Sequence, residues 1–367
     1  MIEDSLKLTS YFGERQRTAD NGFAADALLD LYGRRGIATS ILLRGAEGFG
    51  ARQHLRTDRS ESLSHDLPLT AVAVDTRSRI EDLLEPTVDL LRSGLVTLER
   101  ARLLTGDLET TGPVAAADEE TKLTVYVGRQ ERVYRVPAFV AVCDLLHRRG
   151  IAGATALLGV DGTAHGERER AAFFSRNAGT PMMVIAVGSA TQINRVLPEL
   201  GGLLRQPLLT LERVRICKRD GELLCRPPLP SVPESRAAVD ETQPLTAQPL
   251  TGQLPEAVHK LMIYTSEAAL HDGQPIHRAV VRRLRAAGIS GATTTRGMWG
   301  FHGDHAPHGD RLLQLGRHVP TVTIAIDTPE RIQVAFDLIE DLTAEQGLVT
   351  CEMVPVTRQK PAGARTT

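Results

Sequence analysis

The pattern of hydrophobic and polar residues repeats three times along the chain. A strand-like apolar segment that starts with lysine and ends with tyrosine covers residues 7–11, 122–126 and 260–264. A later apolar segment that ends in glutamate covers residues 95–99, 208–212 and 348–352. Because the same landmarks recur in the same order, we interpret the chain as three copies of one unit of about a hundred residues.

Within each copy, the spacing of apolar residues predicts strand, helix, strand, long loop, strand, helix and strand. In the second copy, for example, Ile193, Val196 and Leu200 fall on one face of the second helix. Each first helix is followed by a glycine suited to a left-handed conformation, namely Gly36, Gly150 and Gly288. The order βαββαβ is that of the ferredoxin-like motif.

These landmarks also give the domain boundaries. The three units cover residues 1–104, 121–217 and 258–356. Residues 105–120 form a polar, acidic linker and residues 218–257 form a proline-rich linker. Residues 357–367 form a tail that we expect to be disordered.

The third strand of a copy is apolar at successive positions, as in residues 184–187 and 322–326. Both faces of such a strand are expected to be covered, one by the helices and the other by a further layer. Three sheet faces on one chain can cover each other. The predicted fold class is therefore α+β, with three ferredoxin-like units packed as an intrachain pseudo-trimer.

Composition narrows the classes of function. The chain has 367 residues, 42% of them hydrophobic and 24% charged, and a formal net charge of -2, which indicates a globular protein and no nucleic-acid partner. No apolar run reaches the ~20 residues that cross a bilayer, so we expect no direct membrane insertion. The four cysteines lack metal-ligand spacing and the N-terminus lacks a secretion signal, so we expect a cytoplasmic location.

Three segments carry a resemblance to a known family. Residues 44–50, Arg-Gly-Ala-Glu-Gly-Phe-Gly, together with residues 66–68 and 94–98, resemble the PII-like family catalogued as domain of unknown function 190. The likeness extends over all three units. It implies PII-like units with ligands in the clefts between them, a small anionic metabolite as ligand and a regulatory role. PII relatives sense chiefly adenine nucleotides and act on a transporter or enzyme, and this family is linked with fluoride channels.

Two glycine-rich loops are the predicted ligand sites. Glycines at a strand end let backbone N–H groups approach an anion, and an arginine fork can bind phosphate or carboxylate oxygens. The predicted ligand-binding residues are Arg44, Gly45, Glu47, Gly48, Phe49, Gly50, Arg296, Gly297, Gly300 and Phe301. The alternative is a tight turn with a packed aromatic ring and a solvated arginine. In the second copy, residues 158–164 have no arginine and no aromatic ring, so the three clefts are not equivalent.

A histidine-rich loop offers a second function. His302, His305 and His308 lie near Asp304 and Asp310, and imidazole with carboxylate can bind zinc, nickel or copper. The loop predicts a metal-binding or metal-tolerance protein as the alternative, although its glycine and proline content also fits a solvated surface loop. A ligand-free interaction scaffold is the third hypothesis.

The recurring lysines and glutamates are a further pair of landmarks. We expect the first and last strands of each copy to be the outer two. Lys7, Lys122 and Lys260 would then meet Glu99, Glu212 and Glu352 only between neighbouring copies. An exposed pair of this kind contributes about 0 to 1 kcal/mol. No nucleophile elbow, zinc-protease motif or phosphate-binding loop of the Walker type is present, so we predict that the protein is not an enzyme.

Overall fold

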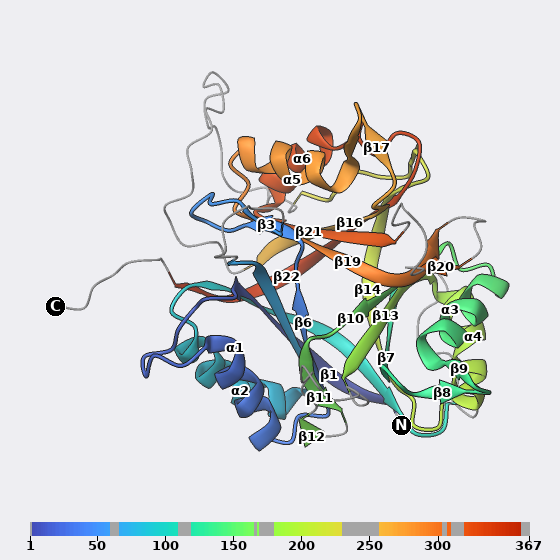
Figure 1. Cartoon of the computed structure of the whole chain (residues 1–367). Helices are drawn as coiled ribbons and strands as arrows, with labels where there is room; N and C mark the ends of the chain where they lie inside the picture. The colour runs from blue at the N-terminus through green and yellow to red at the C-terminus, as the bar shows by residue number, and fades with distance from the viewer. Residues whose placement is uncertain are drawn as a thin grey trace, which may run out of the picture.

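The computed structural model describes residues 2–58, 66–108, 119–164, 167–168, 180–229, 257–302, 307–309 and 319–360. The strands lie in the middle of the molecule, and the helices lie in pairs around them (Figure 1). Each pair of helices belongs to one copy of the repeat.

The described residues of the first copy form two helices and six strands. In chain order they are β1 (Ile2–Gly13), α1 (Ala24–Arg34), β2 (Thr39–Arg44), β3 (Glu47–Phe49), β4 (Arg56–Thr57), β5 (Pro68–Thr76), α2 (Arg77–Leu90) and β6 (Gly94–Thr105).

The second copy has the same plan with additional short strands. Its elements are β7 (Glu120–Gly128), β8 (Arg132–Val133), β9 (Val136–Pro137), α3 (Ala138–Arg148), β10 (Gly153–Leu158), β11 (Asp161–Ala164), β12 (Glu167–Arg168), β13 (Pro181–Ser189), α4 (Ala190–Leu203), β14 (Leu208–Arg219) and β15 (Glu222–Leu223).

The third copy repeats the plan again. Its elements are β16 (Ala257–Ser266), β17 (Leu270–His271), β18 (Gln274–Pro275), α5 (Ile276–Ala286), β19 (Gly291–His302), β20 (His308–Gly309), β21 (Pro320–Asp327), α6 (Pro329–Leu338) and β22 (Leu348–Lys360).

Strands pair in the same order within each copy. In the first copy the order is β6, β1, β5 and β2, and every pairing is antiparallel. The corresponding orders are β14, β7, β13, β10 and β22, β16, β21, β19. The first strand of each copy therefore lies inside the sheet, between the third and the last strand.

The predicted fold class, three ferredoxin-like units packed as an intrachain pseudo-trimer, is wrong. The copies are not separate units, because 18 of the strands in the described part of the chain join in one antiparallel sheet. Strand β6 pairs with β14, β14 with β22, and β22 with β6, so the sheet closes on itself. The prediction considered only face-to-face packing and overlooked the free edges of the last strands.

Those free edges give the physical reason for the closed sheet. An edge strand presents unpaired backbone N–H and C=O groups, and pairing with another strand satisfies them. The edge of β14 pairs with β6 at residues 208–211 and with β22 at residues 215–219. Each last strand therefore pairs with the last strands of both other copies. Its residues between these two pairings lie at the centre of the closed sheet.

Buried side chains form one core per copy and a further core between the copies. The three outer cores lie between the helices and the sheet of each copy and contain, for example, Leu28, Leu146 and Phe336. The central core brings Ile41, Met183 and Met262 together from the three copies. Successive residues of β13 are buried on both faces, as the sequence predicted.

Helix ends follow the sequence signals. Gly36, Gly150 and Gly288 have φ values of 57°, 71° and 69°, which a residue without a Cβ adopts at little cost. Thr328 caps α6 by accepting a hydrogen bond from the Arg331 backbone N–H.

The linkers contain more structure than their composition indicates. β14 continues to Arg219 and forms a hairpin with β15 through Asp220 and Gly221, which have φ values of 47° and 86°. β22 continues to Lys360, into the segment predicted as a tail. The remainder of the proline-rich linker, residues 230–256, and residues 361–367 lie outside the described residues.

Candidate functional site

Three lysines and three glutamates meet at the centre of the closed sheet. In each copy the lysine of the first strand lies directly opposite the glutamate of the last strand, as Lys7 does opposite Glu99. The other two registers pair Lys122 with Glu212 and Lys260 with Glu352. The expectation that these strands are the outer two of each copy is therefore wrong.

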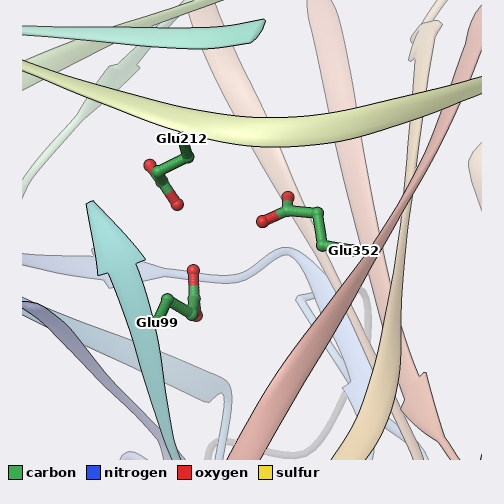
Figure 2. Close-up of side chains that lie close together, drawn as sticks. All are labelled: Glu99, Glu212 and Glu352. Carbon is green, nitrogen blue, oxygen red and sulfur yellow. The ribbon is translucent and has the colours of Figure 1, made fainter. Parts of the chain in front are cut away.

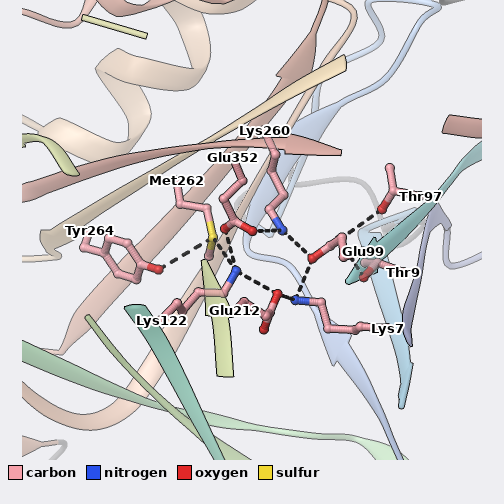
Figure 3. Close-up of polar contacts among 10 residues, drawn as sticks. All are labelled: Lys7, Thr9, Thr97, Glu99, Lys122, Glu212, Lys260, Met262, Tyr264 and Glu352. Carbon is pink, nitrogen blue, oxygen red and sulfur yellow. Dashed lines mark hydrogen bonds and ion pairs between the residues drawn. The ribbon is translucent and has the colours of Figure 1, made fainter. Parts of the chain in front are cut away.

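The six side chains form a closed ring of alternating charge (Figure 3). Each ammonium group contacts the carboxylate of its own copy and that of one neighbour. Within copies the Nζ–Oε distances are 2.6 Å for Lys7–Glu99, 3.0 Å for Lys122–Glu212 and 3.3 Å for Lys260–Glu352. Between copies, Lys260 lies 2.7 Å from Glu99, Lys122 lies 2.5 Å from Glu352, and Lys7 contacts Glu212.

Burial distinguishes this ring from a surface ion pair. No side chain of the six is more than 8% exposed. Burial opposes the ionisation of Glu99, but Lys260 and Lys7 outweigh it and hold the pKa of Glu99 well below its usual value. The same balance, with Lys122 and Lys260 as partners, lowers the pKa of Glu352.

The lysines respond to the same two effects. Burial favours the neutral amine of Lys7, but Glu212 and Glu99 outweigh it and raise its pKa well above the usual value. Lys260 behaves in the same way through Glu352 and Glu99. For Lys122, burial outweighs Glu212 and Glu352, so its pKa is lowered. Since two carboxylates lie within 3.0 Å of Lys122 Nζ, we take it as charged at neutral pH.

The carboxylates alone resemble a cation site. Figure 2 shows Glu99, Glu212 and Glu352 converging from three strands, and an oxygen of each lies within 4.8 Å of the others. However, the three ammonium groups already neutralise these carboxylates, and each carboxylate forms ion pairs with two of the ammonium groups. A cation would have to displace them, so the residues fit a structural ion-pair ring better than a metal centre.

A small cavity adjoins the ring on its lysine side. It has a volume of about 40 Å³, and corresponding positions of all three copies line it, including Lys7, Lys122 and Lys260. A lysine ammonium group has three N–H donors, and the ring contacts use two of each. The third donor of Lys122 faces Met262 Sδ at 3.9 Å. At roughly 10–15 Å³ per water, the cavity has room for water-sized acceptors beside these donors.

The two Arg–Gly loops, residues 44–50 and 296–302, and their counterpart at residues 158–164 lie between copies. Each contains residues that pair with a strand of a neighbouring copy. β3 pairs with β19, β11 with β2, and the end of β19 with β10. A Cβ on Gly48, Gly162 or Gly300 would approach a backbone oxygen of the neighbouring copy to 2.5, 2.2 or 2.2 Å. These glycines allow two backbones to approach closely.

The aromatic residue of each loop is buried in a neighbour's core. Phe49 of the first copy packs in the core of the third, and Phe301 of the third packs in the core of the second. In the second copy Thr163 takes this position and hydrogen bonds to the Ser40 Oγ of the first copy at 2.9 Å. The three loops therefore connect the first copy to the third, the third to the second and the second to the first.

Each of the two predicted arginines contacts at least one carboxylate. Arg44 is half-exposed and lies 2.9 Å from Glu14. Arg296 lies 2.7 Å from Glu267 and also contacts Asp58 of the first copy. Near it, burial raises the pKa of Glu47 above its usual value, against the opposing effect of Arg278. These contacts do not test ligand binding, which stays a prediction for both loops.

The histidine loop is described only in part. The rings of His302 and His308 have centroids 6.4 Å apart, at an angle of 61°. His305, Asp304 and Asp310 lie outside the described residues. Metal binding at this loop therefore stays a prediction.

A cavity between the second and third copies was not predicted. It has a volume of about 30 Å³, and its lining includes Ile185, Arg219, Tyr264 and His302. The Nε atom of Arg219 is buried and has no hydrogen-bond partner among the described residues. Arg219 precedes the Asp220–Gly221 turn, and this Asp-Gly pair is the sequence signal that marks the hairpin.

Comparison with known proteins identifies the repeat. The sequence matches the DUF190 family, described as "Uncharacterized ACR", three times, at residues 5–103, 120–216 and 258–356. The chain belongs to the DUF190 family. The predicted membership with three tandem copies is confirmed.

Two relatives of this DUF190 chain are each called "UPF0166 protein" and come from Aquifex aeolicus (strain VF5). One is 31% identical over 96 residues, which cover 26% of this chain and 90% of the relative. The other is 26% identical over 68 residues, which cover 18% of this chain and 71% of the relative. Each match therefore corresponds to about one copy of the repeat.

Among solved structures, a crystal structure of aspartate kinase from Synechocystis covers 97% of the DUF190 chain, which covers 46% of the kinase chain. The TM-score is 0.23 and the identity 10%, so this likeness carries no argument about the fold. In the described part of the DUF190 chain, no helix has both the length and the apolar character needed to cross a membrane.

Proposed function

We propose that this DUF190 protein is a regulatory protein that binds a compact anion in the cavity between its second and third copies. The observation that carries the proposal is Arg219, a residue of that cavity's lining whose buried Nε atom has no hydrogen-bond partner among the described residues. An unsatisfied guanidinium donor loses hydrogen-bond energy of about 1–3 kcal/mol, which an anionic acceptor restores. The imidazole of His302 is a second donor group in the same lining.

The size of the cavity sets the class of ligand. About 30 Å³ is room for about two water-sized groups, which fits a carboxylate or a small oxyanion. An adenine nucleotide, the ligand implied by the family resemblance, could place only a phosphate there. We therefore propose a compact anionic metabolite, with nucleotides as a second class to test.

Regulation is the second part of the proposal. The cavity lies between two copies, and its lining includes residues of β10, β13 and β14 from the second copy and of β16, β19, β21 and β22 from the third. A ligand that bridges these strands stabilises one relative position of the two copies, and a protein partner can distinguish that position. By family resemblance the proposed partner is a membrane transporter of the fluoride-channel type. The proposal includes no catalytic step, and it places the protein in the cytoplasm.

A thermal-shift screen of the untagged protein tests the binding step. The ligands are phosphate, bicarbonate, fluoride, simple carboxylates, adenine nucleotides and divalent metals. A ligand at 100 times its dissociation constant stabilises the folded state by about 2.7 kcal/mol. We expect one or more anions to raise the melting temperature of the wild type.

Two arginine variants locate the site. Arg219→Ala removes the proposed donor, whereas Arg213→Ala removes an arginine on the same strand whose side chain is 74% exposed. The anion should still stabilise Arg213→Ala and should lose its effect on Arg219→Ala. Equal stabilisation of both variants would remove the cavity from the proposal, and the Arg44→Ala, Arg296→Ala double variant would then test the Arg–Gly loops.

Metal binding remains the alternative function, since the rings of His302 and His308 lie near each other. Stabilisation by divalent metals alone, together with metal retained by the purified untagged protein in mass spectrometry, would favour it. No stabilisation by any ligand would favour a ligand-free interaction scaffold.

A further inference from the structure

Three of the four cysteines lie together, although their positions in the sequence show no ligand spacing. Cys217 belongs to β14, Cys351 belongs to β22, and Cys225 follows β15. Cys217 and Cys351 share the core of the third copy, and Cys225 packs against that core. Cys143, by contrast, lies in the core of the second copy.

Two backbone arrangements bring the three thiols together. The pairing of β14 with β22 sets Arg215 opposite Cys351 and contains an irregularity between Ile216 and Lys218, which includes Cys217. The β14–β15 hairpin then returns the chain, so that the backbone N–H of Cys225 donates to the Cys217 carbonyl at 3.1 Å. The Cys225 thiol lies 3.3 Å from the Ile216 carbonyl.

Accessibility differs among the three thiols. Cys217 is fully buried and Cys351 is 3% exposed, whereas Cys225 is only partly buried. The neighbouring Cys351 thiol and burial raise the pKa of Cys217. Burial and the neighbouring Cys217 raise the pKa of Cys225 to about 11. Cys217 and Cys225 are therefore thiols at neutral pH, and Cys225 is the one of the three cysteines that is not fully buried.

We propose that Cys217, Cys225 and Cys351 form an oxidation site for a peroxide, in which Cys217 forms a disulfide first with Cys225 and then, by exchange, with Cys351. In the first step the Cys225 thiolate attacks the peroxide, becomes a sulfenic acid, and hydroxide leaves to form water with the released proton. The Cys217 thiol then displaces water from this sulfenic acid and forms the Cys217–Cys225 disulfide. Overall, two thiols and one hydrogen peroxide give one disulfide and two waters.

A relay to the third thiol follows from the position of Cys217. Attack of Cys351 on the Cys217 sulfur forms the Cys217–Cys351 disulfide and releases Cys225 as a thiol, without further oxidation. The first disulfide closes only the β14–β15 hairpin. The second joins the second copy to the third. This inference does not depend on whether the cavity near Arg219 binds an anion.

The raised pKa values make this a slow site at neutral pH. Because only the thiolate attacks peroxide, the rate should rise about 10-fold per pH unit until the pH approaches the pKa of Cys225. Cys143 provides an internal control, since it is fully buried in another core and burial raises its pKa also.

Peptide mapping of the folded full-length protein tests the proposal. The protein is treated with hydrogen peroxide between pH 7 and pH 9, alkylated, digested and analysed by mass spectrometry. We expect disulfides of Cys217 with Cys225 and with Cys351, while Cys143 stays reduced. The variant Cys225→Ser changes a partly exposed residue and cannot form the Cys217–Cys225 disulfide. In this variant, formation of the Cys217–Cys351 disulfide should slow at least 10-fold.

Three results would overturn the proposal. One is the absence of both disulfides under these conditions. Another is oxidation of Cys143 as fast as of Cys225, which would indicate reaction in the unfolded chain. The third is formation of Cys217–Cys351 in Cys225→Ser at the wild-type rate, which would remove Cys225 as the point of entry. Circular dichroism of each variant checks that it is folded.

Discussion

Lys260 Nζ lies 2.7 Å from Glu99 Oε2, although 161 residues separate the two in the chain. Lys260 belongs to the third copy and Glu99 to the first, and both side chains are 3% exposed. Together with the two other contacts between copies, this ion pair ties the ends of the repeat into a ring. A buried ring of this kind is sensitive to the loss of any one charge.

The first prediction concerns that charge balance. Glu99→Gln leaves the ring with one uncompensated buried ammonium group and should destabilise the protein by about 3–5 kcal/mol in urea unfolding. Glu81→Gln is the matched control, because Glu81 is 53% exposed and pairs with Arg77 on the surface. Its effect should stay within about 1 kcal/mol. Similar effects of the two variants would contradict a structural role for the ring.

The second prediction concerns acid. The folded-state pKa values of Glu99 and Glu352 lie below the usual 4.5. Between these values and pH 4.5, the folded state therefore binds fewer protons than the unfolded state. The stability they contribute is present above pH 4.5 and is lost as the pH falls through their folded-state pKa values. Urea unfolding as a function of pH should show this loss, with a shallower slope in Glu99→Gln.

At alkaline pH, the contribution of the lysines to stability changes in the opposite direction with pH. The pKa values of Lys7 and Lys260 are raised above 10.5, so their contribution is present below pH 10.5 and is lost as the pH rises through the folded-state values. Lys122, whose pKa is lowered, acts with the opposite sign and in another range, because its effect on stability changes between its folded-state pKa and pH 10.5, below the range of this loss. A stability that rises continuously from pH 10 upwards would contradict this assignment.

The third prediction concerns the close approach of β3 to β19. A Cβ on Gly48 would lie 2.5 Å from the Ala292 backbone oxygen, whereas a Cβ on Gly50 meets no atom within 4 Å. Gly48→Ala should therefore destabilise the protein by about 1–3 kcal/mol. Gly50→Ala should change the stability by less than about 0.5 kcal/mol. Thermal unfolding of both variants compares two glycines of one loop.

The fourth prediction tests the contact of the third copy with the second. Phe301→Ala removes a side chain that is 2% exposed in the neighbour's core, and we expect a loss of about 3–5 kcal/mol in chemical unfolding. Phe23→Ala removes a ring that is 42% exposed and should cost much less. Equal losses would mean that Phe301 does not hold the two copies together.

The glycine-rich loops show how far sequence reasoning reached. Their recurrence marked positions where the backbone has to be approached closely, and the structure places contacts between copies at these positions. The pattern could not distinguish an anion site from a contact with a neighbouring strand, since both require backbone access without a Cβ. Gly48 and Phe49 contact the third copy, and whether the loops also bind a ligand remains a prediction.

The sequence by itself determined the three copies, the strand and helix order within each, and the helix ends at Gly36, Gly150 and Gly288. These features depend on local periodicity and on residues with a restricted or unusually wide choice of backbone angles. Only the tertiary structure decided that the last strands share their edges in one closed sheet. It also decided that Lys7 is buried against Glu99 and Glu212, and that Cys217 lies with Cys225 and Cys351. These contacts join residues far apart in the chain, and strand register at a free edge leaves no local periodic signal.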